Sequence, residues 1–347
     1  MSSLETIRVS CLRRILFLDS MRGFAIFLMM IIHAYSFATI DPLSGKAYGT
    51  NSALVLAPEI PLATMFPIFF FVSGISIAIS ISRRRSKGEG ILGIASHFAG
   101  RALLLVSVGI AISGIGGLSG IQFYFLNGRE PISLIGLSAL LALPAIYLGT
   151  PKRLAALAVT SYAIVGGALL SEPLILFAGA AGPILLTGPF SMFKTMPLIL
   201  AGASIGLQAS SSTSIRKVTL ASSGGALLAA VVAGSAFYTG EVAYASTYFI
   251  SIPLVASIGL LGTPIFAALE GRGIRLMPLA VFGRTGLFVY GAQIFILTLA
   301  MIIFPYSPGN DVFVLMTLAC LATLWPASYF IVRAKGGTKA YSPPAIT

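Results

Sequence analysis

The sequence predicts an all-α fold, a polytopic bundle of about ten transmembrane helices with both termini in the cytoplasm. The first observation is composition: of 347 residues, 57% are hydrophobic and 9% charged, and the mean hydropathy is +0.97. Apolar runs of spanning length recur along the chain, and basic residues gather in alternate connections. So few charges could not cover a soluble domain of this size, so we expect an integral membrane protein.

Nine apolar runs are long enough to cross a bilayer. They lie near 20–39, 62–82, 100–117, 132–149, 153–171, 218–239, 243–269, 278–304 and 312–332. A tenth crossing is expected within 173–209. Its first part, 173–190, is rich in Gly and Pro and is interpreted as a re-entrant or surface helix, which needs protein or a wet cavity to satisfy its backbone.

The basic residues set the orientation, because Lys and Arg are concentrated on the cytoplasmic side. If 173–209 crosses once, 17 of the 22 lysines and arginines are cytoplasmic, and Lys46, Arg129 and Lys194 are external. Arg22 and Arg284 remain within the membrane. Two crossings would invert every later loop, so ten spans in the cell membrane are favoured.

One membrane domain is predicted over residues 1–340, with a disordered tail at 341–347. The first apolar run reads as a retained signal anchor. Cys11 and Cys320 are far apart, and the chain has only two histidines, so neither a disulfide nor a metal site is expected. Topology accounts for the net charge of +12, so nucleic acid is not an expected partner, whereas membrane lipid is.

Three ionisable residues in the first span are the main catalytic candidates, because such groups are costly in a bilayer. Asp19 and Arg22 are three residues apart, and His33 follows Arg22 by eleven residues, about 16 Å along the same helix face. A buried neutral imidazole is suited to general-base catalysis. The alternatives are a histidine that only packs between helices, and an Arg22 that only pairs with Asp19.

Two other sets of basic residues are open to two interpretations each. Arg83, Arg84, Arg85 and Lys87, with Arg101 nearby, could bind a phosphorylated cofactor or anchor the chain to anionic lipid. Arg284 precedes Tyr290 and Gln293 in the ninth span and could instead extend to the membrane interface.

The segment 41–61 is predicted to be the longest external loop. Its Asp41 and Glu59 are groups that recognise sugars or other polar acceptors, although a solvated loop would have the same composition.

The segment LDSMRGFAIFLMMIIH resembles a signature of membrane acyltransferases, in which L-D-x-x-R-G precedes an apolar run and a histidine. The segments MFPIFFFVSGISIAIS, GRALLLVSVGI, PISLIGLSALLAL and GRTGLFVYGAQ are similar to elements of the heparan-alpha-glucosaminide N-acetyltransferase-like family. The resemblance is best over 13–150, returns weakly at 279–295 and is not evident between. Gln293 stands where that family usually has a histidine, and Gly286 where it usually has a serine.

The resemblance implies an acyl-CoA-dependent membrane acyltransferase, with acetyl-CoA as the favoured co-substrate. Its phosphates would be held by the basic residues Arg83, Arg84, Arg85, Lys87, Arg101 and Arg284. His33 would act as the base beside Arg22 and Asp19. An external sugar or glycolipid would offer a hydroxyl or amine near Asp41, Glu59, Tyr290 and Gln293.

Two other functions remain open from sequence alone. A transporter or flippase for a polar lipid or small anion would also use buried Arg, Asp and His. An inactive scaffold is the other. A homodimer is compatible with the acyltransferase, the transporter and the scaffold alike.

Overall fold

The computed structural model describes residues 16–39, 52–118, 131–169, 183–187, 191–210, 227, 243–272, 274, 276–303 and 310–335. This described part is all-helical, as predicted. Its eleven helices are α2 (Leu16–Thr39), α3 (Ser52–Ser86), α4 (Ile91–Leu118), α5 (Pro131–Leu148), α6 (Pro151–Leu169), η3 (Pro183–Thr187), α8 (Met192–Ser210), α10 (Ala243–Gly271), α11 (Met277–Arg284), α12 (Gly286–Ile303) and α13 (Asn310–Ala334).

Four described helices contain segments long and apolar enough to cross a membrane: Ile91–Gly114, Pro131–Leu148, Ile252–Glu270 and Val312–Ala334. The bent pair of α11 and α12 makes a fifth if it counts as one span. The predicted class, a helical integral membrane protein, is therefore confirmed. The count of ten spans and the cytoplasmic placement of both termini stay predictions.

The chain divides into two compact units. Unit 1 comprises Met1–Thr50 and Phe266–Thr347, and unit 2 comprises Asn51–Ile265. Unit 1 thus holds α2, α11, α12, α13 and the end of α10, while unit 2 holds α3 to α8 and most of α10. The single domain over 1–340 stays a prediction.

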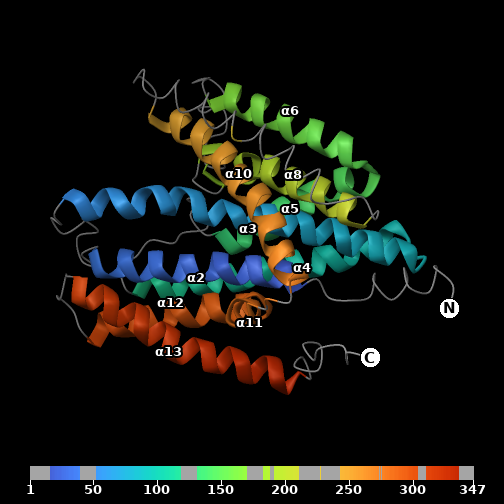
Figure 1. Cartoon of the computed structure of the whole chain (residues 1–347). Coiled ribbons are helices and arrows are strands. Elements are labelled where there is room, and N and C mark those ends of the chain that lie inside the picture. The colour runs from blue at the N-terminus through green and yellow to red at the C-terminus, as the bar shows by residue number, and fades with distance from the viewer. Residues whose placement is uncertain are drawn as a thin grey trace. The chain divides into compact units, whose positions relative to one another are not determined.

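In unit 1, α2 packs against α11, α12 and α13 (Figure 1). The crossing of α2 with α11 is close because glycines face backbone on both sides. A Cβ on Gly23 would lie 1.6 Å from the Leu279 carbonyl oxygen, and one on Gly283 would lie 1.8 Å from the Asp19 carbonyl oxygen. Any side chain at either position would push the two helices apart.

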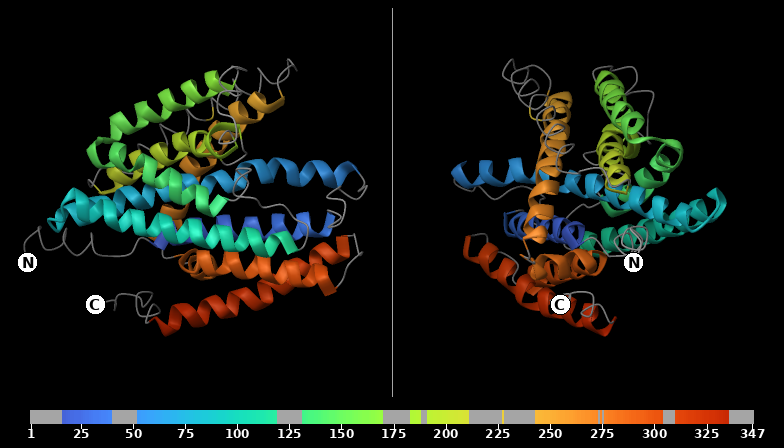
Figure 2. Two further views of the ribbon diagram at one scale, coloured as in Figure 1. Left: turned by 180° about the vertical axis from the view of Figure 1, so that it is seen from behind. Right: turned by 45° about the vertical axis from the view of Figure 1, so that its right-hand side comes forward.

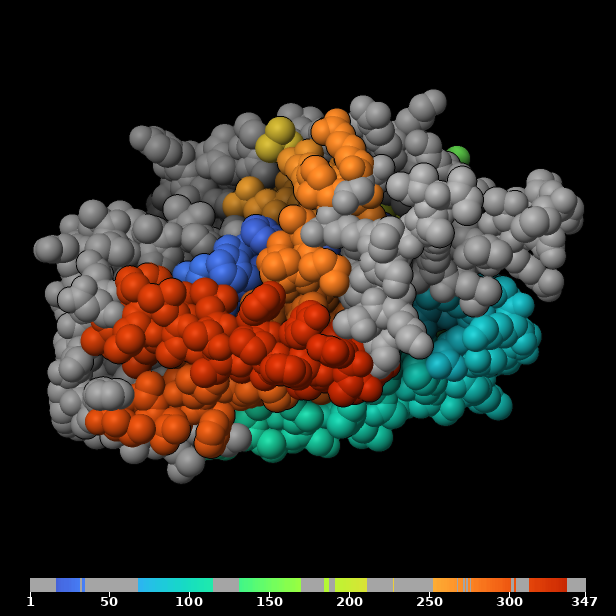
Figure 3. Space-filling view, turned by 60° about the horizontal axis from the view of Figure 1, so that its bottom comes forward, coloured from blue at the N-terminus to red at the C-terminus, as the bar shows by residue number. Residues whose placement is uncertain are grey.

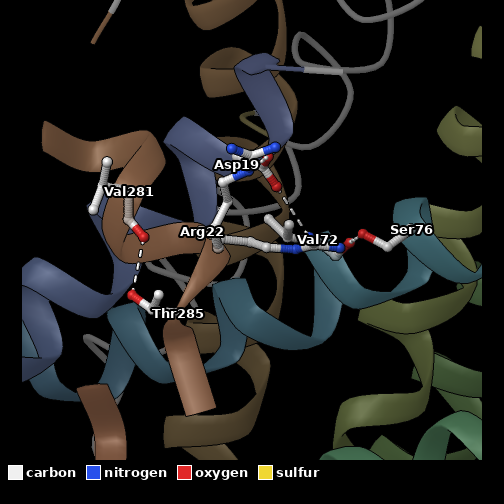
Figure 4. Close-up of polar contacts among 7 residues, drawn as sticks. Asp19, Arg22, Val72, Ser76, Val281 and Thr285 are labelled. Atoms are coloured by element: carbon white, nitrogen blue, oxygen red, sulfur yellow. Dashed lines mark hydrogen bonds and ion pairs between the residues drawn. The ribbon is translucent and has the colours of Figure 1, made fainter. Parts of the chain in front are cut away.

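The predicted span at 278–304 is not one straight helix. Its two parts, α11 and α12, meet at an angle of 87° at Thr285. Thr285 leaves helical geometry at φ −107° and ψ 19°, and its hydroxyl donates to the Val281 carbonyl oxygen at 3.0 Å (Figure 4). A hydroxyl that bonds the preceding turn, followed by the flexible Gly286, makes a bend inexpensive, and apolar patterning does not reveal it.

Unit 2 is built around α3, which packs on α8, while α4 lies against α5 and α6 against α8 (Figure 2). At 35 residues, α3 is about 52 Å long, which exceeds the roughly 30 Å hydrocarbon core. The crossing of α3 with α8 uses glycines too: a Cβ on Gly74 would lie 2.0 Å from the Ile199 carbonyl oxygen, and one on Gly202 would lie 1.9 Å from that of Phe71.

The structure describes parts of the two predicted connections at 41–61 and 173–209. The external loop at 41–61 is too long, because its last ten residues, from Ser52 onward, belong to α3 despite Pro58 and Pro61. Within 173–209, the structure describes only η3, residue 191 and α8. The re-entrant segment at 173–190 therefore lies largely outside the described residues, and the single crossing stays a prediction.

Candidate active site

His33 lies on α2 in the interior of unit 1, where only 2% of its surface is exposed. Its Nδ1 lies 2.8 Å from the Nε2 of Gln293, a residue of α12 that is completely buried. The ring of Tyr290 meets the imidazole edge-on, with centroids 5.8 Å apart and an interplanar angle of 68°. Tyr290 and Gln293 share a face of α12 because they are three residues apart. Two helices thus enclose one imidazole.

Asp19, 3% exposed at its side chain, accepts contacts from two arginines of unit 1. The Nη1 of Arg22 lies 3.4 Å from its Oδ1, and the Nε of Arg284 lies 3.6 Å from its Oδ2. The Arg22 contact joins residues one turn apart on α2, as predicted, and Figure 4 shows both side chains. The Arg284 contact comes from the end of α11 and was not predicted.

These two clusters lie far apart on α2. Asp19 and His33 are separated by 14 residues, about 21 Å along the helix axis. The Asp19 cluster therefore cannot contact the imidazole directly. In the Asp19 cluster, the two arginines compensate the negative charge of the Asp19 carboxylate near the start of α2. In the same region, Glu270 accepts a hydrogen bond from the Phe17 backbone N–H at 2.9 Å. That N–H belongs to the first turn, which lacks intrahelical partners. Glu270 was missed, although its carboxylate at the end of an apolar run was a signal.

The basic cluster of unit 2 comprises Arg83, Arg84 and Arg85 in the last turn of α3, Lys87 in the connection to α4, and Arg101 within α4. Glu89 N–H donates to the Arg84 carbonyl and Gly88 N–H to that of Arg85, at 3.1 and 2.9 Å, and Gly88 has φ +81°. This is a Schellman ending, which closes the last turn of a helix with a left-handed glycine. The turn brings the end of α3 and the start of α4 together.

The side chains of this cluster are not equivalent. Arg84 pairs with Glu89 at 2.6 Å, so its charge is compensated. Arg85 donates to the Tyr147 carbonyl oxygen at 3.1 Å and lies over the ring of Tyr147 at 4.9 Å. Lys87 and Arg101 are exposed, and Arg83 is half-buried. The exposed members are the ones that an anion from solution can reach.

The other predicted site residues are placed as follows. Asp41 lies outside the described residues, and Glu59 lies in α3 instead of a loop. Cys320 is buried in α13, while Cys11 is outside the described part of the chain. Among described residues, no three His, Cys, Asp or Glu side chains are grouped closely enough to hold a metal ion.

A groove of about 550 Å³ opens on unit 1 between α2, α11 and α13. Its lining is apolar and consists of Phe27, Pro278, Leu279, Phe282, Leu318, Leu321, Ala322 and Trp325. Trp325 is the one tryptophan of the chain and is 42% exposed. Residues of α13, coloured red, are exposed on the face shown in Figure 3, as expected for a lipid-facing helix.

Apolar helices and buried ionisable side chains define a polytopic membrane protein whose polar groups lie between helices. The family model of the heparan-alpha-glucosaminide N-acetyltransferase catalytic domain matches residues 14–234, so the chain belongs to this family. It is therefore an acetyl-CoA-dependent membrane acetyltransferase, and its family implies a sugar amine as acceptor. A search of curated proteins finds no match.

The match also corrects the extent of the resemblance. It continues through 151–234, where the sequence motifs gave no sign of the family. The element GRTGLFVYGAQ lies beyond the matched residues, so its correspondence to the family stays a prediction.

Proposed function

We propose that this enzyme moves an acetyl group from cytoplasmic acetyl-CoA to an amine or hydroxyl of a sugar or glycolipid on the opposite side of the membrane. The observation that carries the proposal is His33, a buried imidazole held by α12 within a chain of this family. A base between helices suits a donor and an acceptor that arrive from opposite faces.

In the proposed reaction, Nε2 of His33 takes the proton of the acceptor as its nitrogen or oxygen attacks the thioester carbonyl carbon. A bond from the acceptor to that carbon forms, and the carbon–sulfur bond breaks. The imidazolium then returns the proton to the leaving sulfur, so CoA departs as a thiol. No nucleophile of the protein is needed, and His33 ends neutral.

We assign the phosphates of the co-substrate to the basic cluster of unit 2. Exposed Lys87 and Arg101 support this assignment most directly, with Arg83 and Arg85 beside them. Arg84 is less suited, because Glu89 already compensates its charge. Arg284 of α11 contacts Asp19 of α2, which favours a role in holding these two helices together over direct binding of CoA. Arg22 pairs with Asp19 within α2, which likewise favours a structural role.

The test is acetyl transfer from labelled acetyl-CoA to amino sugars and glycolipids by the purified protein, with His33→Ala and His33→Gln. Loss of a general base typically lowers the rate 10²–10⁴-fold. Both variants should show this loss while acetyl-CoA affinity stays within a few fold. His97→Gln, which changes the other histidine, is the control and should retain activity.

Retention of more than about a tenth of the rate in His33→Gln would remove His33 from the base role, since general-base loss is larger than this. Movement of an amino sugar across proteoliposomes without acetyl-CoA would instead support a transporter.

A further inference from the structure

The side chain of Gln293 lies in hydrogen-bond contact with Nδ1 of His33. We propose that the Gln293 amide carbonyl accepts a hydrogen bond from Nδ1–H, which leaves the lone pair of His33 on Nε2, where the acceptor's proton is received. Gln293 is then a positioning residue. This inference rests on the proposed role of His33 as the base.

The contact is one that can determine a tautomer. The structure places Nε2 of Gln293 2.8 Å from Nδ1 of His33, and a half-turn of the amide puts the carbonyl oxygen in that place. Both side chains are buried, with 2% and 0% exposure. Both residues belong to unit 1. A neutral imidazole has one N–H and one lone pair, and the hydrogen bond made by one nitrogen decides the state of the other.

The two ends of the amide have opposite consequences. The amide has nearly the same shape after a half-turn, so the carbonyl or the NH₂ group fits the same space. If NH₂ faces Nδ1, that nitrogen holds the lone pair and Nε2 becomes a donor that cannot accept a proton. If the carbonyl faces Nδ1, Nε2 becomes the base. Only the second orientation is compatible with proton removal by Nε2.

Tyr290 limits the other freedom of the imidazole, its rotation. The edge-on ring contact, 5.8 Å between centroids, comes from the same face of α12 as Gln293. Two residues of α12 therefore fix the imidazole: Tyr290 restricts the rotation of the ring, and Gln293 determines which ring nitrogen carries the proton. A neutral amide does this without adding a charge in the membrane, where an unpaired carboxylate would be costly.

The chain allows a direct spectroscopic test, because it contains only two histidines. In His97→Gln protein, every ¹⁵N-histidine resonance belongs to His33. At a pH where the imidazole is neutral, we expect Nδ1 to be protonated and Nε2 unprotonated in lipid nanodiscs. Gln293→Leu should mix the two tautomers or reverse them. Thr317→Val, which removes a hydroxyl of α13 bonded within its own helix, should leave the spectrum unchanged.

A protonated Nε2 in His97→Gln protein would overturn the proposal, as would a tautomer that does not respond to Gln293→Leu. Activity provides a second readout. Gln293→Leu should lower kcat at least tenfold and leave KM for acetyl-CoA within a few fold, whereas a merely structural defect would lower both binding and yield of folded protein.

The two hypotheses fail differently. If His33→Gln remains active, the base assignment is wrong, but the tautomer spectrum can still match. If the spectrum shows Nε2–H while His33→Gln is inactive, His33 acts and Gln293 does not position it as proposed.

Discussion

At the scale of residues, Asp19 receives two arginines of unequal exposure. Arg284 is 8% exposed at its side chain and Arg22 is 31% exposed. Removing one partner of a buried ion pair costs about 3–5 kcal/mol, while a solvated pair contributes about 0–1 kcal/mol. The guanidinium of Arg284 should therefore matter more to stability than that of Arg22.

We expect Arg284→Ala to lower the unfolding temperature more than Arg22→Ala does. Asp19→Asn in the Arg284→Ala background should recover part of the lost unfolding temperature, because a neutral amide leaves no unpaired charge buried. Modification of the buried Cys320 by a thiol-reactive dye during heating reports unfolding in a Cys11→Ser background. Arg333→Ala, at an exposed position of α13, is the control. Equal stability of the two single variants and the double variant would exclude this ion pair.

The basic cluster of unit 2 leads to a prediction about affinity. Lys87→Glu and Arg101→Glu should weaken acetyl-CoA binding, most strongly at low salt, because exposed charges are screened within about 10 Å at 0.1 M. Lys152→Glu is the control, since it reverses an exposed charge on the same predicted side. Isothermal titration over a range of salt concentrations measures the effect. Binding that is unchanged at low salt would leave the cluster as a lipid anchor.

The residue-scale site was predictable only within one helix. The spacing of Asp19 and Arg22 and the cost of burying His33 follow from α2 alone. Gln293 and Arg284 were predicted to be ligands of substrate and of co-substrate, and this stays a prediction. Their contacts with His33 and Asp19 were not predicted. Their contacts with α2 depend on which helices are neighbours and on the bend at Thr285, and neither is encoded in the apolar pattern of one span.

At the scale of elements, close helix crossings in both units depend on glycines that face the backbone of the neighbouring helix. Reciprocal glycines bring α2 against α11 in unit 1, and α3 against α8 in unit 2. Lipid offers no hydrophobic driving force between helices, so association relies on close van der Waals contact, which small residues allow. Gly202 and Gly206 have the small-xxx-small spacing of such interfaces, a signal that sequence analysis left unused.

Gly23→Ala tests this dependence on glycine. Its Cβ would meet the Leu279 backbone, which cannot move aside as a flexible side chain can. We expect a marked loss of folded protein, seen as early aggregation by size-exclusion chromatography after heating. Gly93→Ala in α4, where a Cβ meets no atom within 4 Å, should be neutral or slightly stabilising because Ala favours helices by about 1 kcal/mol. Equal behaviour of the two variants would contradict the close crossing.

At the scale of the whole molecule, composition and run length predicted the helical membrane class. They could not count the spans, because 173–209 permits one or two crossings. Apolar periodicity also gave no sign of the division into two units, since α2 joins helices more than 200 residues later in the chain. Such long-range pairing depends on tertiary packing.

The orientation is testable by cysteine labelling. Single cysteines at Ser86, Ser214 and Ser342 should react only from the cytoplasmic side, and one at Ser44 only from outside, because 17 of the basic residues then lie inside. Of these positions, only Ser86 lies in the described part of the chain. A membrane-impermeant maleimide on intact cells makes the measurement in a background without Cys11 and Cys320. External labelling at Ser214 or Ser342 would indicate that 173–209 crosses twice.

The groove on unit 1 gives a test of membrane depth through Trp325. Because α13 is a candidate span and the groove is apolar, we expect lipid chains to contact the indole. Since the chain has no other tryptophan, its fluorescence reports this contact alone. In nanodiscs, lipids brominated on their acyl chains should quench the emission, whereas aqueous iodide should not.

Ala322→Phe is the matched variant, because it adds a ring inside the groove one turn before Trp325. Filling the groove should reduce quenching by brominated chains without exposing the indole to iodide. Phe330→Ala changes an exposed position of the same helix outside the lining and should leave quenching unaltered. Strong quenching by iodide with none from brominated lipid would place this face of α13 in water and contradict its assignment as the last span.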